Sequence, residues 1–153
     1  MLTDETIYAL ATVSGKSAIA TFRISGKNTG KIIKLISLIK KIEIKKIKLT
    51  KIFTNKKKNE EADLATIIFY KSPKSYTGED LAEITVHGGP AIIKEMYGML
   101  YNTGLCRLAY PGEFTRRAFE NNKIDLIQAE AVIDLINAET REQRIQASKQ
   151  LSG

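Results

Sequence analysis

The chain has 153 residues, a net charge of +7 and a single cysteine, Cys106. This length is enough for one domain with a hydrophobic core, or for one domain and a fragment of another. The sequence has no apolar run near the roughly 18 residues of a membrane span, no signal-peptide pattern at "MLTDET" and no second cysteine for an internal disulfide. We therefore expect a soluble cytoplasmic protein without membrane association, with Cys106 as a small buried or half-buried side chain.

The N-terminal region predicts a β-hairpin in place of a nucleotide-binding loop. Residues 6–12 and 17–25 are rich in β-branched and apolar side chains and are joined at a Ser-Gly turn. The stretch "ATVSGKS" resembles the end of a P-loop, but Leu10 stands where the first glycine is needed and a strand follows where a helix should open. A second candidate, "GKNTGK", has one residue too few between its glycines. The sequence therefore excludes a P-loop at both places.

A helix and a strand are predicted next. Asn28 and Thr29 are suited to cap a helix. Its apolar face would comprise Ile32, Ile33, Leu35, Ile36, Leu38 and Ile39. Residues 43–53 alternate in polarity, which predicts a strand with one face in water.

Lysine dominates this region. Residues 31–58 contain eleven lysines, no arginine and one acid, Glu43, which gives the segment a net charge of +10. Such a run either solvates the helix and the strand or attracts RNA weakly through counterion release. The absence of arginine, which is suited to bidentate contacts, favours the first interpretation.

The middle of the chain predicts further strands and one helix. Residues 64–70 and 81–87 are strand-like and are separated by a polar loop with Pro and Gly. Pro90 is placed to open a helix that runs to about residue 102 and stops at Gly104, and residues 105–109 form a short last strand. These elements predict an α+β fold, a mixed β-sheet with packed helices.

From Pro111 the pattern becomes helical. Residues 111–123 predict a short helix, and residues 124–150 a long one without glycine or proline. The apolar positions of the long helix are Leu126, Ala129, Val132, Ile133 and Ile136. Such a one-sided helix is marginal without a packing partner. We expect a domain boundary near residue 120, with the long helix as the first helix of a helical domain whose remainder is absent.

Four motifs, in this order and spacing, resemble the N-terminal part of the MnmE (TrmE) family of tRNA-modification GTPases. They are "DETIYALAT", "FRISG", "SYTGEDLAEITVHGGP" and "PGEFTRRAFENNKIDLIQAEAVIDLI". The resemblance covers nearly the whole chain and is weakest across residues 31–62. It implies a fold similar to other tetrahydrofolate-binding C1-transfer domains, with residues 1–119 as a folate-binding and dimerisation α/β domain and residues 120–153 as the first helix of the helical domain.

The resemblance also implies cofactors and partners. The family uses 5,10-methylene- or 5-formyl-tetrahydrofolate as a one-carbon source and works with MnmG, an FAD protein. Together they add an aminomethyl-type group to the wobble uridine of certain tRNAs. GTP, magnesium and potassium belong to a GTPase domain inserted in the helical domain, which we expect these residues to lack. Because the residues form no nucleophile–base pair, we expect a binding platform whose chemistry is completed by partner groups.

The resemblance assigns folate contacts to Arg23, Glu83 and Lys123. A pterin ring presents an amino group and a ring N–H side by side, and a carboxylate such as that of Glu83 can accept both hydrogen bonds. The glutamate tail of a folate carries carboxylates, which require Arg or Lys. On the residues alone, Glu83 could equally be a strand residue facing water, Arg23 a surface charge at a strand end, and Lys123 an ordinary exposed lysine.

Other polar residues receive weaker assignments. Glu79 and Asp80 are expected in a solvated loop, and Tyr76 could offer its ring to the pterin or p-aminobenzoyl group. His87 is more typical of a structural or cavity-wall residue than of a catalytic base. One histidine and one cysteine cannot form a metal cluster in such positions.

Two departures from the family pattern bear on folate binding. The family usually has a Gly/Pro-rich basic loop where this chain has residues 13–17, including Lys16, and it commonly has arginine where this chain has Tyr110. Two rival interpretations stay open: a dimerisation or scaffold module without folate binding, and a basic tRNA-binding module built on residues 31–58.

Overall fold

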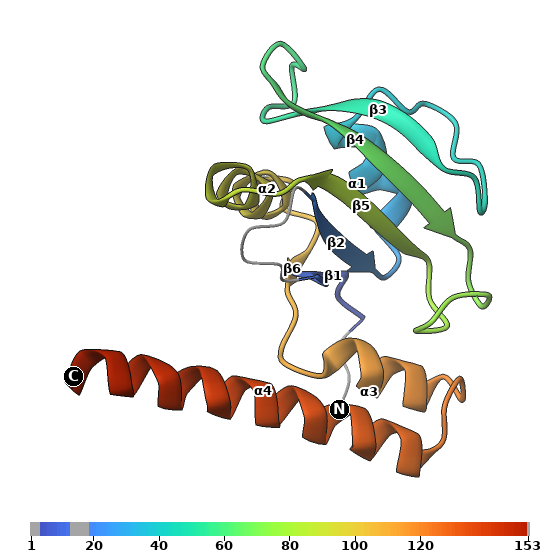
Figure 1. Cartoon of the computed structure of the whole chain (residues 1–153). Helices are drawn as coiled ribbons and strands as arrows, with labels where there is room; N and C mark the ends of the chain where they lie inside the picture. The colour runs from blue at the N-terminus through green and yellow to red at the C-terminus, as the bar shows by residue number, and fades with distance from the viewer. Residues whose placement is uncertain (1–3, 13–18, 153) are drawn as a thin grey trace.

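A computed structural model of the chain describes residues 4–12 and 19–152. In these residues a six-stranded mixed sheet and four helices form an α+β fold, as predicted (Figure 1). The strands are β1 (Ile7–Leu10), β2 (Ile19–Ser25), β3 (Lys48–Phe53), β4 (Glu61–Tyr70), β5 (Leu81–His87) and β6 (Arg107–Leu108). The helices are α1 (Thr29–Ile36), α2 (Pro90–Asn102), α3 (Glu113–Glu120) and α4 (Leu126–Ser152).

The order of strands in the sheet is β3-β4-β5-β2-β1-β6. All neighbours pair antiparallel except β1 and β6, which are parallel. The pairing of β1 with β2 confirms the predicted strands of the N-terminal hairpin, and the P-loop candidate is excluded because β2, not a helix, follows it. The turn itself, with Lys16, lies outside the described residues.

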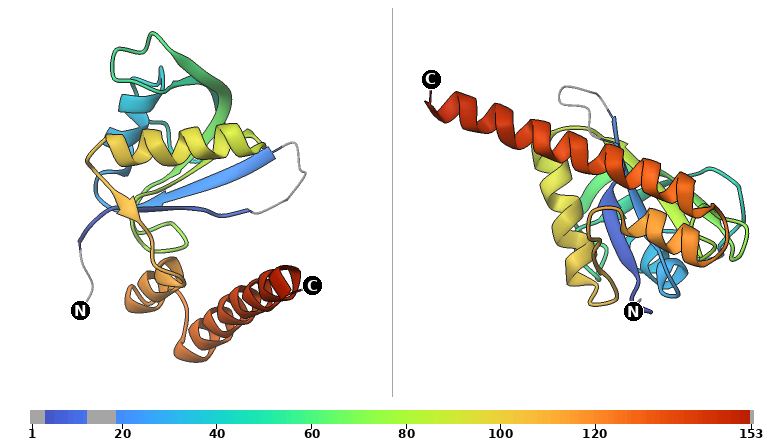
Figure 2. Two further views of the ribbon diagram at one scale, coloured as in Figure 1. Left: turned by 90° about the vertical axis from the view of Figure 1, so that its left-hand side faces the viewer. Right: turned by 90° about the horizontal axis from the view of Figure 1, so that it is seen from below.

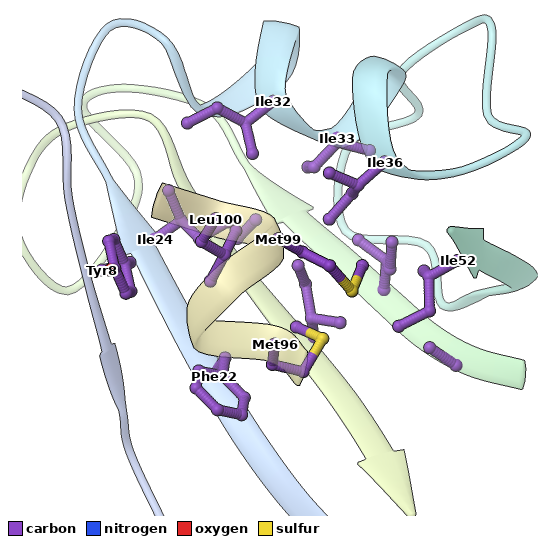
Figure 3. Packing of buried hydrophobic residues seen from close by; sticks show 14 of the residues in the cluster. Tyr8, Phe22, Ile24, Ile32, Ile33, Ile36, Ile52, Met96, Met99 and Leu100 are labelled. Carbon is purple, nitrogen blue, oxygen red and sulfur yellow. The ribbon is translucent and has the colours of Figure 1, made fainter. Parts of the chain in front are cut away.

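One face of the sheet carries the hydrophobic core. Helices α1 and α2 both pack there, and Figure 3 shows Ile33 of α1 and Met96 of α2 directed toward the strands. Alternate residues of each central strand point into this core. In β2 and β5 they are Ala20, Phe22, Ile24, Ala82, Ile84 and Val86, all at most 3% exposed. The period of two places the residues between them on the opposite face.

Three predictions for residues 28–47 differ from the structure, the first at the end of α1. Helix α1 ends at Ile36, so Leu38 is exposed, because Ser37 is extended and pairs with Ile52 of β3. Lys58 Nζ then donates hydrogen bonds to the carbonyls of Lys34 and Ser37 at the helix end, where the last carbonyls lack helical partners.

The N-terminal cap of α1 and the extent of β3 also differ from expectation. Asn28 makes no side-chain cap, since its amide donates to the Leu105 carbonyl at 3.0 Å. Strand β3 begins at Lys48 instead of residue 43, because the backbone at Lys45 turns into the left-handed region with φ 60°.

Helices α3 and α4 lie together below the sheet, away from α1 and α2 (Figures 1 and 2). Ala129 of α4 is buried and Ile133 contacts the region of Gly112, whereas Leu126 and Leu135 are exposed. None of the helices in the described residues is both long enough and apolar enough to traverse a lipid bilayer. The domain boundary at residues 119–120 stays a prediction.

Candidate functional site

The face of the sheet opposite the core carries the two residues that were predicted to bind a ligand. Arg23 of β2 and Glu83 of β5 are direct partners in the antiparallel register. Both lie on this face because their neighbours along each strand point into the core. Their side chains form an ion pair, with 3.4 Å between Arg23 Nη2 and Glu83 Oε2. The side chains are 28% and 29% exposed, so both are partly desolvated yet reachable.

Two aromatic rings enclose the Arg23 guanidinium. Its central carbon lies 5.4 Å from the ring centroid of Tyr76 and 5.6 Å from that of Phe114 in α3. Such cation–π contacts favour a charged group that has lost part of its water. Arg23 Nε is buried and has no hydrogen-bond partner within the described residues. An unsatisfied buried donor is costly, so the position of Arg23 Nε at the wall of a cavity requires an explanation besides stability.

Beside this pair lies a cavity of about 420 Å³. Its lining residues come from β2, β4, β5, the loop of residues 71–80 and the turn before β3: Arg23, Lys45, Tyr70, Lys74, Ser75, Tyr76, Leu81 and Glu83. The volume is in the range of small-molecule sites. One carboxylate, three cationic groups and two tyrosines give it the means to bind a flat polar ring together with an anionic group.

A buried arginine connects this cavity to α3. Arg117 is 1% exposed and donates to Glu79 Oε1 at 3.0 Å, to the Glu5 carbonyl at 2.7 Å and to Glu113 Oε2 at 3.3 Å. The hydroxyl of Ser25 also donates to Glu79, at 2.7 Å. Glu79 is thus only partly solvated, and its carboxylate joins β2 and α3 to the loop that carries Tyr76.

A second arginine completes the network. Arg107 makes two hydrogen bonds to the Glu113 carboxylate, at 2.8 and 2.6 Å, and lies 3.4 Å from Glu5. Burial raises the pKa of Glu113, but the hydrogen bonds from Arg107 and the Tyr110 amide, with the charges of Arg107 and Arg117, lower it more. The pKa of Glu113 is thus below its usual value, and the carboxylate stays ionised beside two arginines.

The chain is similar to known proteins over most of its length. The family model for the N-terminus of the GTP-binding protein TrmE matches residues 6–123. The chain belongs to the TrmE N-terminal family. Its sequence is 47% identical over 149 residues to a tRNA modification GTPase MnmE of Pelagibacter ubique, covering 97% of this chain and 33% of that protein.

Other relatives of the same name match as well. The MnmE protein of Aquifex aeolicus is 47% identical over 154 residues, covering 97% of this chain and 33% of the relative. That of Thermotoga maritima is 47% identical over 137 residues, covering 89% of this chain and 30% of the relative. The chain thus spans about a third of the length of the curated relatives that it matches.

In this TrmE N-terminal chain, Lys123 lies apart from Arg23 and Glu83. Its Nζ is exposed and donates to the Pro73 carbonyl at 2.9 Å, and its amide donates to the Ala118 carbonyl. Lys123 does not line the cavity. It contacts Pro73, the neighbour of Lys74, and Lys74 does line the cavity. The structure therefore brings two of the three predicted contacts together and places the third against the same loop.

The weaker candidates are placed as follows. Tyr76 lines the cavity, and its hydroxyl lies 3.0 Å from Thr115 Oγ1, so its ring contacts Arg23 from a fixed position. His87 lies at the far end of β5, outside the cavity lining, and pairs with Asp63 at 2.9 Å. No group of three or more potential metal ligands occurs among residues 4–12 and 19–152.

Tyr110, where the resemblance led us to expect arginine, also lies outside the cavity lining. Its ring is under the Arg107 guanidinium, with 4.8 Å between the Arg107 central carbon and the ring centroid. Sequence reasoning missed the roles of Arg117 and Phe114, although both stand in the motif "PGEFTRRAF". The spacing of four residues between Glu113 and Arg117 is a signal that could have indicated an ion pair on one helix face.

Proposed function

We propose that this TrmE N-terminal domain binds a tetrahydrofolate, as 5,10-methylene- or 5-formyl-tetrahydrofolate, in the cavity beside Arg23 and Glu83. The observation that carries the proposal is the ion pair of these two side chains on the solvent-facing side of the sheet, at the wall of a cavity of about 420 Å³. Paired charges placed beside a cavity, away from the core, are typical of a ligand site.

Each residue has a defined part in this proposal. Glu83 Oε1 accepts no hydrogen bond from the described residues, so the carboxylate has free lone pairs for the pterin amino group and ring N–H. Arg23 fixes the other carboxylate oxygen and is itself held by Tyr76 and Phe114. The folate, when bound, supplies the one-carbon unit.

In this proposal Lys123 stabilises the loop of residues 71–80 through its bond to Pro73, or it contacts a ligand once that bond is broken. Its hydrogen bond to the Pro73 carbonyl holds the segment 71–80, which contributes three cavity residues. A ligand contact from Lys123 would require exchange of that bond. Such an exchange would link ligand binding to the junction between α3 and α4, where Lys123 stands.

We further propose the setting of this domain. Residues 1–119 form a dimerising folate domain and residues 120–153 begin a helical domain of a cytoplasmic tRNA-modification GTPase. An MnmG-type FAD protein would be the partner that acts on the wobble uridine. The relatives are tRNA modification GTPases by name, which supports the tRNA-modification setting. The exposed lysines of residues 31–58 support at most a weak contact with tRNA.

Isothermal titration with 5-formyl-tetrahydrofolate tests the proposal. The wild-type chain should bind saturably, and Glu83→Gln should weaken binding about 10- to 100-fold, because a charge-assisted pair of hydrogen bonds is lost. Glu61→Gln is the matched control, since Glu61 is an exposed strand carboxylate that pairs with Lys51 away from the cavity. Folded protein that gives no saturable binding would favour the scaffold interpretation and refute the proposal.

The tRNA contact has a separate test. Replacing exposed lysines of residues 31–58 by glutamine in pairs should weaken tRNA binding and reduce its dependence on salt. Binding that is unchanged by these substitutions would exclude residues 31–58 as a tRNA contact.

A further inference from the structure

We propose that the cavity prefers folates whose tail carries several glutamates, and that Lys45 and Lys74 are the residues that create this preference. This inference rests on the proposed folate function. It assigns a specific role to one member of the lysine-rich segment, which the sequence alone left as a solvated or RNA-attracting run.

The two lysines reach one cavity from separate segments of the chain. Lys45 comes from the turn before β3 and Lys74 from the loop of residues 71–80, and both line the cavity that Arg23 and Glu83 also line. Both side chains are exposed, so they lie where a ligand tail would leave the cavity toward solvent.

The backbone at each lysine is anchored. The Lys45 amide donates to the Phe69 carbonyl of β4 at 2.8 Å, and its φ of 60° is held by that bond and by the bridge of Ile44 with Phe69. The Lys74 amide donates to the Lys71 carbonyl at 2.8 Å. The positions of the two charges are thus set by the fold, although the side chains are long.

The charge balance of the cavity distinguishes these lysines from their neighbours. Among the residues that the structure describes, neither Lys45 nor Lys74 forms an ion pair. Nearby lysines are paired, in contrast: Lys46 and Lys48 with Glu43, Lys51 with Glu61, and Lys71 with Asp80. Since Glu83 pairs with Arg23, the lining keeps two positive charges without a counter-charge.

A ligand that places its pterin ring on Glu83 therefore meets uncompensated positive charge. A folate with one glutamate brings two carboxylates, and each further glutamate adds one carboxylate to the tail. Exposed ion pairs contribute little individually, roughly a two- to five-fold gain in affinity each, and salt weakens them. Two lysines therefore predict a selectivity for the longer tail, not an absolute requirement.

Titrations with 5-formyl-tetrahydrofolate as the monoglutamate and as the triglutamate test this inference. At low salt the wild-type chain should bind the triglutamate about 4- to 25-fold more tightly, with a smaller ratio at high salt. The double variant Lys45→Ala/Lys74→Ala should reduce the ratio to near one while it keeps its affinity for the monoglutamate within a few-fold.

The control is Lys56→Ala/Lys57→Ala, which removes two lysines of the same segment that do not line this cavity. This variant should keep the wild-type ratio. A wild-type ratio near one, or an equal fall of the ratio in the control, would overturn the inference and leave folate binding intact. Absence of binding for both ligands would instead overturn the proposed function on which the inference rests.

Discussion

Removal of the Arg117 side chain should be one of the most damaging single substitutions in the α3 region. Arg117 is 1% exposed and joins Glu79, the Glu5 carbonyl and Glu113. In Arg117→Met an unbranched apolar side chain replaces the stem of the arginine and the guanidinium is lost, so the carboxylates that faced it lose their partner. Breaking a buried ion pair from one side costs about 3–5 kcal/mol.

Two features of the network place the expected loss near the lower end of that range. Glu113 keeps its two hydrogen bonds from Arg107, and Glu79 keeps the Ser25 hydroxyl and is 26% exposed, so water can reach it. We expect Arg117→Met to lower the free energy of unfolding by about 3 kcal/mol, measured by urea denaturation. Arg116→Met is the matched control, because Arg116 is the exposed neighbour, and it should change stability by less than about 0.5 kcal/mol.

A double variant tests the reason for the loss. Glu79→Gln removes the carboxylate that Arg117→Met leaves without its partner, so the pair together should be about 1–2 kcal/mol less destabilised than the sum of the two single variants. Equal stability of Arg117→Met and Arg116→Met, or strict additivity with Glu79→Gln, would refute the view that α3 is held to the 71–80 loop by this ion pair.

Two further predictions concern stability. At Gly26 the backbone has φ of 136° and an added Cβ would lie 2.6 Å from the Thr6 Cα, so Gly26→Ala should lower the free energy of unfolding by more than about 2 kcal/mol. Gly98 of α2 has open space around it, so Gly98→Ala should raise the free energy of unfolding by about 0.5–1 kcal/mol. Similar effects of the two variants in thermal or urea unfolding would contradict the packing at Gly26. The pKa of Glu113 is lowered from 4.5 in the folded state, so its contribution to stability is present above that value and is lost as the pH falls through the folded pKa. The difference in unfolding free energy between wild type and Glu113→Gln should accordingly be large at neutral pH and shrink as the pH falls from 4.5 through the lower, folded pKa. A difference that is constant with pH would contradict the assignment.

Much of the fold could be predicted from the sequence, because it depends on local periodicity. The β-branched and apolar composition predicted strands at residues 17–25 and 81–87, and the structure has β2 at Ile19–Ser25 and β5 at Leu81–His87. Pro90 and Gly104 marked the limits of α2. Such signals depend on a few neighbouring residues and need no knowledge of the tertiary structure.

The errors occur where distant parts of the chain decide the local structure. The end of α1 depends on the bridge of Ser37 with Ile52 and on Lys58, which no local pattern reveals. The partner of Glu79 is 38 residues away at Arg117, so each residue taken alone resembled a surface charge. The resemblance named Arg23 and Glu83 as candidates, but the contact of Arg23 with Phe114 of α3 and the cationic wall at Lys45 and Lys74 depend on tertiary contacts.

The most direct test of the central claim is an experimental structure of the protein with 5-formyl-tetrahydrofolate bound. We predict that the Glu83 carboxylate lies within hydrogen-bonding distance of the pterin amino group and ring N–H, with Arg23 still between Tyr76 and Phe114. A folate bound elsewhere, with Glu83 directed into solvent, would contradict it.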